Sequence, residues 1–188
     1  MTNEGVSKEL EINRKWAMPN SKTFSIKPIQ ELIINVSNRC GKHITIVDPF
    51  ANEQLIKQYI EFDKYISNDL DTQYNTDYHL DATDFLKNIP SDSVDLVLYD
   101  PPYSPRQVSE VYKKLDMSVN MQTTQSSYWS KQKKEISRIV KNNGRVITFG
   151  WNSGGVGKSN GFIIEEILLV PHGGWHNDTI CTVEIKTI

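Results

Sequence analysis

Asp100, Pro101, Pro102 and Tyr103 stand directly after the apolar run 94–99 and form the most informative motif of this sequence. An aspartate side chain and a proline carbonyl both accept hydrogen bonds, and proline has no N–H that would compete. Such a corner at the end of a buried strand could hold a planar –NH2 group by its two protons. The Tyr103 ring could stack on the heterocycle that carries this amine. The motif therefore predicts a site that positions an amino group for transfer chemistry, and the alternative is an ordinary strand that ends in a Pro-Pro turn.

Acidic residues also follow the other expected strands. Asp48 comes directly after the run 43–47, and Asp69 comes shortly after the run 64–66. Ligands of open α/β sheets gather at the carboxyl ends of the strands. A carboxylate beyond the second strand suits the two hydroxyls of a ribose, so Asp69 is the candidate for that contact. Asp81 is expected near the same edge, although each of these acids alone could be a simple cap.

Strands and helices alternate along the chain that must position these residues. Helices are expected over 28–38, 54–61, 82–89 and 130–140, strands over 43–47, 64–66, 94–99 and 145–149, and a hairpin over 162–170 and 179–186. This alternation predicts an α/β fold, with a mostly parallel twisted sheet, helices on both faces and an antiparallel C-terminal hairpin. We expect residues 1–22 to form a flexible arm and residues 23–188 to form a single domain.

Length and composition set mild limits. The 188 residues, 38% of them hydrophobic, suffice for one domain with a substantial core. No apolar run approaches 18 residues and the polar start lacks the apolar region of a signal peptide, so we expect no membrane segment and a cytoplasmic protein. Cys40 and Cys181 are single and far apart, which indicates neither a disulfide framework nor a zinc knuckle.

The net charge of −2 is unevenly distributed. Residues 104–160 hold ten Lys and Arg against three Asp and Glu, a charge of +7, whereas the remainder holds 11 against 20, a charge of −9. A local basic excess is typical of a surface that contacts phosphates, but it is equally typical of an exposed helix face. The basic candidates for such a contact are Arg106, Lys131, Lys134 and Lys158.

Taken in order, these motifs resemble those of S-adenosylmethionine-dependent, adenine-specific DNA methyltransferases of the Asp-Pro-Pro-Tyr type, and in particular the small phage- and prophage-associated adenine methylases. The resemblance covers about residues 27–185. It implies a Rossmann-like methyltransferase fold, S-adenosylmethionine as cofactor, and methyl transfer to the exocyclic amino group of a flipped adenine. It implies a catalytic role for Asp100, Pro101, Pro102 and Tyr103. The cofactor contacts that it implies are Lys27, Pro28, Asp48, Pro49, Phe50, Asn52, Asp69, Asp81 and Ala82.

The chain departs from the family in two respects. The family's cofactor loop continues Asp-Pro-Phe-x-Gly-x-Gly, whereas residues 48–53 are DPFANE, without glycine. The side chains of Asn52 and Glu53 could take over this contact, or the chain could be a cofactor-binding or DNA-binding module without activity. The chain also has no room for a separate target-recognition domain, so only the segments 104–129 and 151–161 remain to contact DNA. Its specificity is therefore expected to be short, relaxed or supplied by a second subunit or a homodimer. The resemblance implies that Trp151 and Asn152, in the segment 151–161, contact the flipped base.

The expected partner is double-stranded DNA in a bacterial or phage-infected cell, and methylation of RNA or of a protein glutamine is the alternative activity. Asp rather than Asn at position 100 favours adenine. The glycine-rich stretch 150–159 lacks the spacing of a nucleotide-hydrolysing loop. His172, His176 and Asp178 could bind a metal, but a polar turn is the favoured interpretation, and no metal site is expected.

Overall fold

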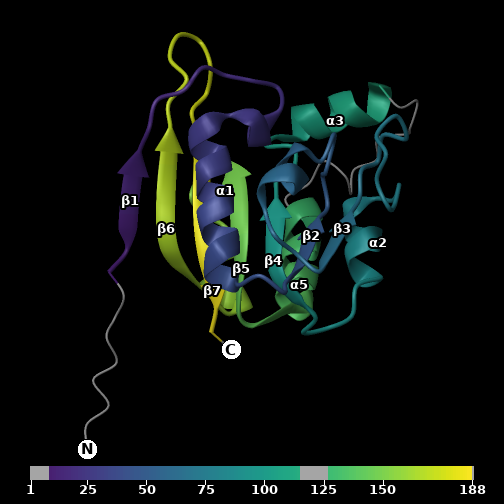
Figure 1. The fold of residues 1–188 in the computed structure, drawn as a ribbon. Coiled ribbons are helices and arrows are strands. Elements are labelled where there is room, and N and C mark those ends of the chain that lie inside the picture. The colour runs from purple at the N-terminus through teal and green to yellow at the C-terminus, as the bar shows by residue number, and fades with distance from the viewer. Residues whose placement is uncertain (1–8, 115–126, 188) are drawn as a thin grey trace, which may run out of the picture.

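The computed structural model describes residues 9–114 and 127–187, which form one seven-stranded sheet with helices around it (Figure 1). The strand order is β1-β6-β7-β5-β4-β2-β3, and only β7 runs antiparallel to its neighbours. The strands are β1 (Glu11–Arg14), β2 (Thr45–Asp48), β3 (Lys64–Ser67), β4 (Val94–Tyr99), β5 (Val140–Gly150), β6 (Phe162–Val170) and β7 (Thr179–Lys186). The predicted α/β class, with its antiparallel C-terminal hairpin, is confirmed.

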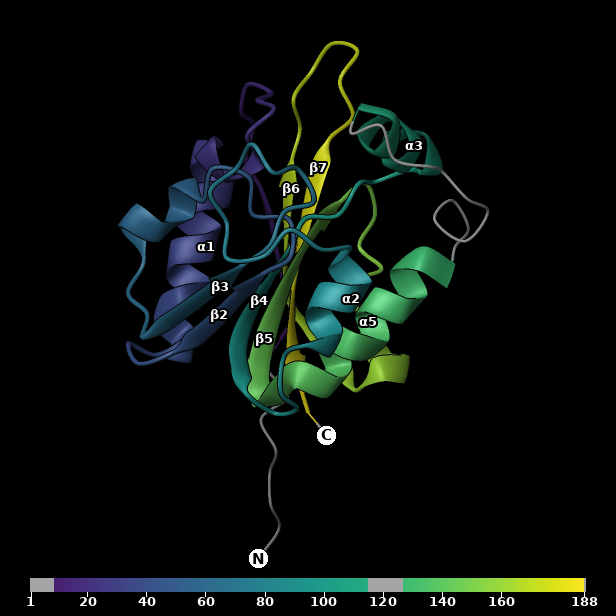
Figure 2. The same cartoon turned by 90° about the vertical axis from the view of Figure 1, so that its right-hand side faces the viewer.

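Helices cover both faces of the sheet, with α1 on one face and α2 and α5 on the other (Figure 2). The α-helices are α1 (Lys27–Cys40), α2 (Ala82–Lys87), α3 (Pro105–Lys114) and α5 (Ser127–Ile139), and the short 3-10 helices are η1 (Thr23–Ser25), η2 (Leu55–Tyr59) and η3 (Lys158–Asn160). The α3 helix lies above the carboxyl ends of the strands rather than on a face (Figure 2).

Strand β4 shows how the two cores arise. Successive side chains of a strand point to opposite faces. Leu96 and Leu98 therefore pack in the core beneath α1, while Val97 and Tyr99 pack in the core beneath α2 and α5. Because both faces are covered, the strand is apolar almost throughout, and its exit at Asp100 places polar atoms at the sheet edge.

Strand β1 corrects the expectation of a flexible arm over 1–22. Residues 11–14 pair in parallel with β6, and Glu11 lies opposite Glu166. The backbone N–H of Lys15 continues the ladder by donating to the Leu169 carbonyl at 2.9 Å. Four mostly polar residues carry little strand pattern of their own, so the free edge of β6 determines this strand. Residues 1–8 lie outside the described part of the chain.

Three other segments differ from expectation. The helix expected over 54–61 is the 3-10 helix η2, entered through Gln54 in a left-handed conformation. Part of the expected loop 104–129 is helical, in α3 and the start of α5, and residues 115–126 lie outside the described residues. Strand β5 starts at Val140, five residues earlier than expected, because an irregularity in its pairing with β4 absorbs the turn residues around Asn143 (φ +63°).

Candidate active site

The carboxyl ends of β2, β3 and β4 surround a cavity of about 390 Å³. The cavity is enclosed by η1, the loop after β2, the segment after β3, the start of α2, and the corner after β4 together with α3 and α5. Its lining includes Thr23, Pro49, Phe50, Asn52, Asn68, Asp69, Asp81, Ala82, Asp100, Pro101, Pro102, Tyr103, Gln107, Glu110, Tyr112 and Tyr128. The sequence motif at 100–103 and the acids Asp69 and Asp81 thus lie at one site.

Several hydrogen bonds hold the corner after β4. The Tyr103 hydroxyl donates to Asp100 Oδ1 at 2.5 Å, and the Tyr103 N–H donates to Gln107 Oε1 at 2.6 Å. On the other side, Trp129 Nε1 donates to the Pro102 carbonyl at 3.0 Å. The aspartate carboxylate therefore faces the cavity from a fixed position.

The carboxyl groups of this edge influence one another. Burial raises the pKa of Asp100, and hydrogen bonds from Tyr103 and Thr23 lower it in part. The pKa of Asp48 is raised to about 7, chiefly by burial and in part by the charges of Asp100 and Asp69, although two hydrogen bonds to its carboxyl lower it. Among the described residues that line the cavity, none is Lys, Arg or His. The cavity therefore carries negative potential without a compensating base in its wall.

Asp69, for which the sequence predicts a ribose contact, lines the cavity. Its Oδ2 accepts the Asn52 N–H at 3.0 Å, and its Oδ1 accepts the Asp71 N–H at 2.9 Å. Each carboxylate oxygen has further lone pairs that can accept other hydrogen bonds. The two backbone bonds fix the carboxylate at the cavity wall.

The neighbouring Asn68 was missed by the sequence analysis, yet it holds the site together. Its side-chain amide donates to the Pro49 carbonyl at 3.1 Å and to the Leu80 carbonyl at 3.0 Å, and its Oδ1 accepts the Leu80 N–H at 2.9 Å. It thereby joins the loop after β2 to the start of α2. In the sequence, only its position shortly after a predicted strand could have indicated this role.

The loop after β2 has two residues with positive φ, a conformation that glycine adopts most readily, although the loop contains no glycine. Asn52 and Gln54, which occupy the two glycine positions of the family's motif, have φ values of +46° and +54°. Asparagine tolerates this left-handed region better than most residues. Asn52 lines the cavity, whereas Glu53 lines a smaller neighbouring cavity and pairs with Lys22 at 2.7 Å.

Three predicted cofactor contacts do not line the main cavity. Lys27 is exposed and Pro28 is buried in the first turn of α1. The buried Asp48 accepts hydrogen bonds from the Tyr65 hydroxyl at 2.7 Å and the Phe50 N–H at 3.3 Å. Instead, Thr23 of η1 reaches the cavity, and no spacing in the sequence marked it.

Asp81 and Ala82 do line the cavity, at the start of α2. The Asp81 carboxylate caps this helix by accepting a hydrogen bond from the Thr83 N–H at 2.8 Å, and it also accepts one from the Tyr112 hydroxyl at 2.7 Å. Tyr112 of α3 packs with Val108 and with Tyr128 of α5. These tyrosines, which the sequence analysis missed, connect α3 to the cavity wall.

The predicted nucleic-acid contacts fall into two groups. Trp151 follows β5 and packs edge-on against Tyr103, with ring centres 5.5 Å apart, and Asn152 is exposed beside it. Arg106 on α3 pairs with Glu110 at 2.8 Å, and the exposed residues Lys131 and Lys134 lie on α5. Lys158 belongs to the other group, at the far end of the sheet.

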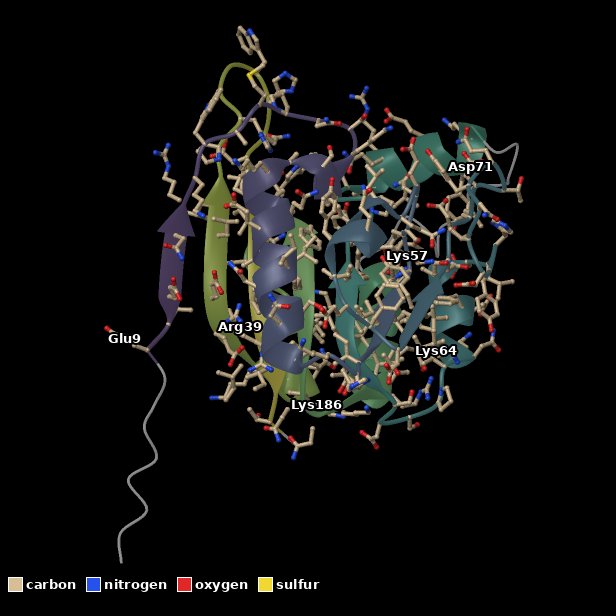
Figure 3. All side chains as sticks on the ribbon, in the orientation of Figure 1. Glu9, Arg39, Lys57, Lys64, Asp71 and Lys186 are labelled. Carbon is tan, nitrogen blue, oxygen red and sulfur yellow. The ribbon has the colours of Figure 1, made fainter. Side chains whose placement is uncertain are left out.

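The position of Lys158 follows from the strand directions. It lies in η3, just before β6 begins at Phe162, which pairs with Lys186. Figure 3 shows Lys186 at the lower end of the molecule and the cavity-lining Asp71 at the upper end. Lys158 is therefore remote from the corner at Asp100.

The glycine-rich loop between β5 and β6 binds a carboxylate of the protein itself. The Val156 and Gly157 N–H groups donate to the Glu184 carboxylate at 2.6 Å and 2.8 Å. Gly155 has a φ of +50°, and a methyl group there would overlap the Glu184 side chain. The loop is thus anchored internally at the amides that a phosphate would otherwise contact.

His172 has a structural setting. Its Nδ1 lies 2.9 Å from the Ala17 carbonyl and its Nε2 lies 2.8 Å from Thr179 Oγ1. In the described part of the chain, no group of three or more His, Cys, Asp or Glu could hold a metal ion. Over the same residues, no helix is both long and apolar enough to cross a bilayer.

No protein-family model and no curated protein matches this sequence, whereas solved structures do. The N-methyltransferase NodS from Bradyrhizobium japonicum WM9 superposes with a TM-score of 0.59 at 9% identity, covering 90% of this chain and 100% of that one. TrmN from Thermus thermophilus gives 0.58 at 14%, covering 86% and 49%, so this chain spans about half of its length.

A third similar structure is the 1,6-didemethyltoxoflavin-N1-methyltransferase from Burkholderia thailandensis with bound 1,6-didemethyltoxoflavin and S-adenosylhomocysteine. It gives a TM-score of 0.55 at 10% identity, covering 82% of this chain and 77% of that one. Together with the strand order, these likenesses define a Rossmann-like methyltransferase fold.

Proposed function

We propose that this chain is an adenine-specific DNA methyltransferase that uses S-adenosylmethionine to methylate the exocyclic amino group of an adenine in double-stranded DNA. One observation carries the proposal. The corner 100–103 opens into the same cavity as Asp69 and the loop 49–52. A site for an amino group and a site for a nucleoside thus share one cavity wall.

The residues of the cavity fit the proposed cofactor. Asp69 suits the ribose hydroxyls, and the apolar surfaces of Phe50 and Ala82 suit the adenine ring. The acidic wall without lining bases favours a cationic ligand over one that carries phosphates. When bound, S-adenosylmethionine supplies an electrophilic methyl group on a positively charged sulfur. The left-handed backbone at Asn52 and Gln54 supports a binding loop that does not need glycine.

The corner residues prepare the amine. The Asp100 carboxylate and the Pro101 carbonyl accept hydrogen bonds from its two N–H groups, which localises the nitrogen lone pair and points it into the cavity. Fixed acceptors of this kind act through positioning and electrostatic stabilisation. Tyr103 and Trp151 offer aromatic rings for the target base. Such a base must leave the duplex stack, at a cost of roughly a few kcal/mol.

The test is the transfer of isotope-labelled methyl from S-adenosylmethionine to unmethylated double-stranded DNA, with the labelled nucleosides identified by mass. We expect methyladenine, and we expect Asp100→Asn to reduce the transfer rate by about 10²–10³-fold, because it removes a charged acceptor. Cofactor affinity, measured by calorimetry, should change little. The matched control is Asp84→Asn, which removes an exposed carboxylate that pairs with Lys87.

The outcomes separate the functions. Label in RNA or protein, but not in DNA, would replace the proposed substrate and keep the methyltransferase activity. Cofactor binding without transfer to any of these would favour a module without activity. Absence of cofactor binding would refute the proposal at its first step.

A further inference from the structure

The connection between β6 and β7, residues 171–178, projects from the sheet at the edge that carries the candidate active site. Ile180, near the start of β7, pairs with Gly150, the last residue of β5. The residue after Gly150 is Trp151, which packs against Tyr103. In Figure 1 this connection forms the yellow loop that rises above the rest of the molecule. The loop therefore begins beside the corner and extends outward from it.

The base of the loop is firmly held. The His172 ring lies between the Ala17 carbonyl and the Thr179 hydroxyl, and the His172 N–H donates to the Asp178 carboxylate at 3.4 Å. The Ala17 N–H donates to the Pro171 carbonyl at 3.2 Å. Strand β7, at the other end of the loop, lies between β5 and β6 and pairs with both. A side chain at the tip is thus carried on a fixed support.

The tip carries an indole that the protein does not cover. Trp175 has a relative exposure of 103%, far above the 41% of Trp151. Gly173 and Gly174, with φ values of +70° and +60°, form the turn that precedes it. Trp16 and Met18 are also exposed, at 62% and 68%. Trp16 lies beside the loop, because a methyl group added to Gly173 would lie 3.6 Å from Trp16 Nε1.

We propose that Trp175 enters the base stack of duplex DNA next to the target adenine and occupies the space that the flipped base leaves. This inference rests on the proposed function. Aromatic and apolar side chains are known to part base steps in this way, and an aromatic ring stacks on any base. Duplex DNA is favoured as the partner because the loop continues the edge at which Tyr103 and Trp151 already present aromatic rings.

The experiment measures DNA unwinding, which does not depend on methyl transfer. Relaxed closed-circular plasmid is incubated with the full chain and topoisomerase I, and the linking number is read after deproteinisation. The variants are Trp175→Ala and the control Ile163→Ala, which removes an exposed apolar side chain from the far end of β6. Melting temperatures confirm that both variants fold.

We expect wild type and Ile163→Ala to shift the linking number equally, and Trp175→Ala to shift it less than a third as much. In the labelled-methyl assay, Trp175→Ala should lose at least tenfold on duplex DNA and less than twofold on single-stranded DNA. Equal unwinding by wild type and Trp175→Ala, or no unwinding by wild type, would overturn the proposal that Trp175 enters the base stack as a wedge. Unwinding that depends on Trp175, without methyl transfer, would keep the wedge and refute the proposed activity.

Discussion

Asp48 shows how a residue for which the sequence predicts a binding role can serve the fold. It is fully buried, its carboxyl accepts the Tyr65 hydroxyl at 2.7 Å, and burial raises its pKa to about 7. The unfolded chain releases this proton near pH 4. Between those values the folded protein holds a proton that the unfolded chain has lost. The stabilising contribution is therefore complete below about pH 4 and is lost as the pH rises through about 7.

For this reason, Asp48→Asn should remove part of the pH dependence of stability. Between pH 5 and pH 8 the free energy of unfolding of the wild type should fall by ~3 kcal/mol on account of this group. The variant should lack that part of the decrease. Urea unfolding of both proteins at the two pH values provides the measurement. Parallel pH profiles would show that Asp48 is ionised in the folded protein throughout.

Residues at strand ends could be located from the sequence, whereas residues that meet through tertiary contacts could not. Asp69 and Asp100 line the cavity because a parallel sheet brings its carboxyl ends to one edge. Thr23 and Tyr112 reach the same cavity from a 3-10 helix and from a helix above the sheet. Their positions depend on how distant segments pack, and no local pattern encodes that.

The conformation of the loop between β5 and β6 depends on one internal contact, that of its amides with the Glu184 carboxylate. Gly155→Ala should destabilise the protein by about 2–4 kcal/mol, because it adds left-handed strain and displaces the Glu184 carboxylate from the Val156 and Gly157 amides. Gly174→Ala is the matched control. Gly174 also has a positive φ, but a methyl group there meets nothing within 4 Å, so the loss should stay at about 1–2 kcal/mol. Equal urea midpoints for the two variants would contradict the anchoring role.

Elements with a full hydrophobic pattern were predictable, as β4 and the β6–β7 hairpin show. The α3 helix was missed although its sequence carries helix signals: Ser104 just before it, Pro105 in the first turn, and Val108 four residues before Tyr112. In the structure the Ser104 hydroxyl accepts a hydrogen bond from the Gln107 N–H at 3.2 Å. Its surroundings are polar, and that composition obscured the short apolar face. Strand β1 has no hydrophobic pattern of its own, because it forms by pairing with the edge of β6.

At the scale of the whole molecule, the acidic cavity should favour a positively charged ligand over a neutral one. Burial raises the pKa values of Asp48, Asp69 and Asp100, so acidification protonates this edge earlier than it would free carboxyls. The protein should bind cationic S-adenosylmethionine more tightly than neutral S-adenosylhomocysteine at pH 8, and the ratio of the two affinities should fall towards pH 5.5. Titration calorimetry at the two pH values tests this. A ratio independent of pH would mean that these carboxyls do not sense the sulfonium charge.

The pairing of β1 with β6 has a consequence for synthesis. Ribosomes make residues 11–14 long before residues 166–169, yet these two stretches lie side by side in the finished sheet. While the intervening chain emerges, the early segment has no strand to join, and β6 in turn needs β7 between itself and β5. The sheet can therefore close at this edge only after almost all of the sequence has left the ribosome. A pulse-labelled nascent chain should accordingly remain open to proteolysis near Arg14 until that late stage.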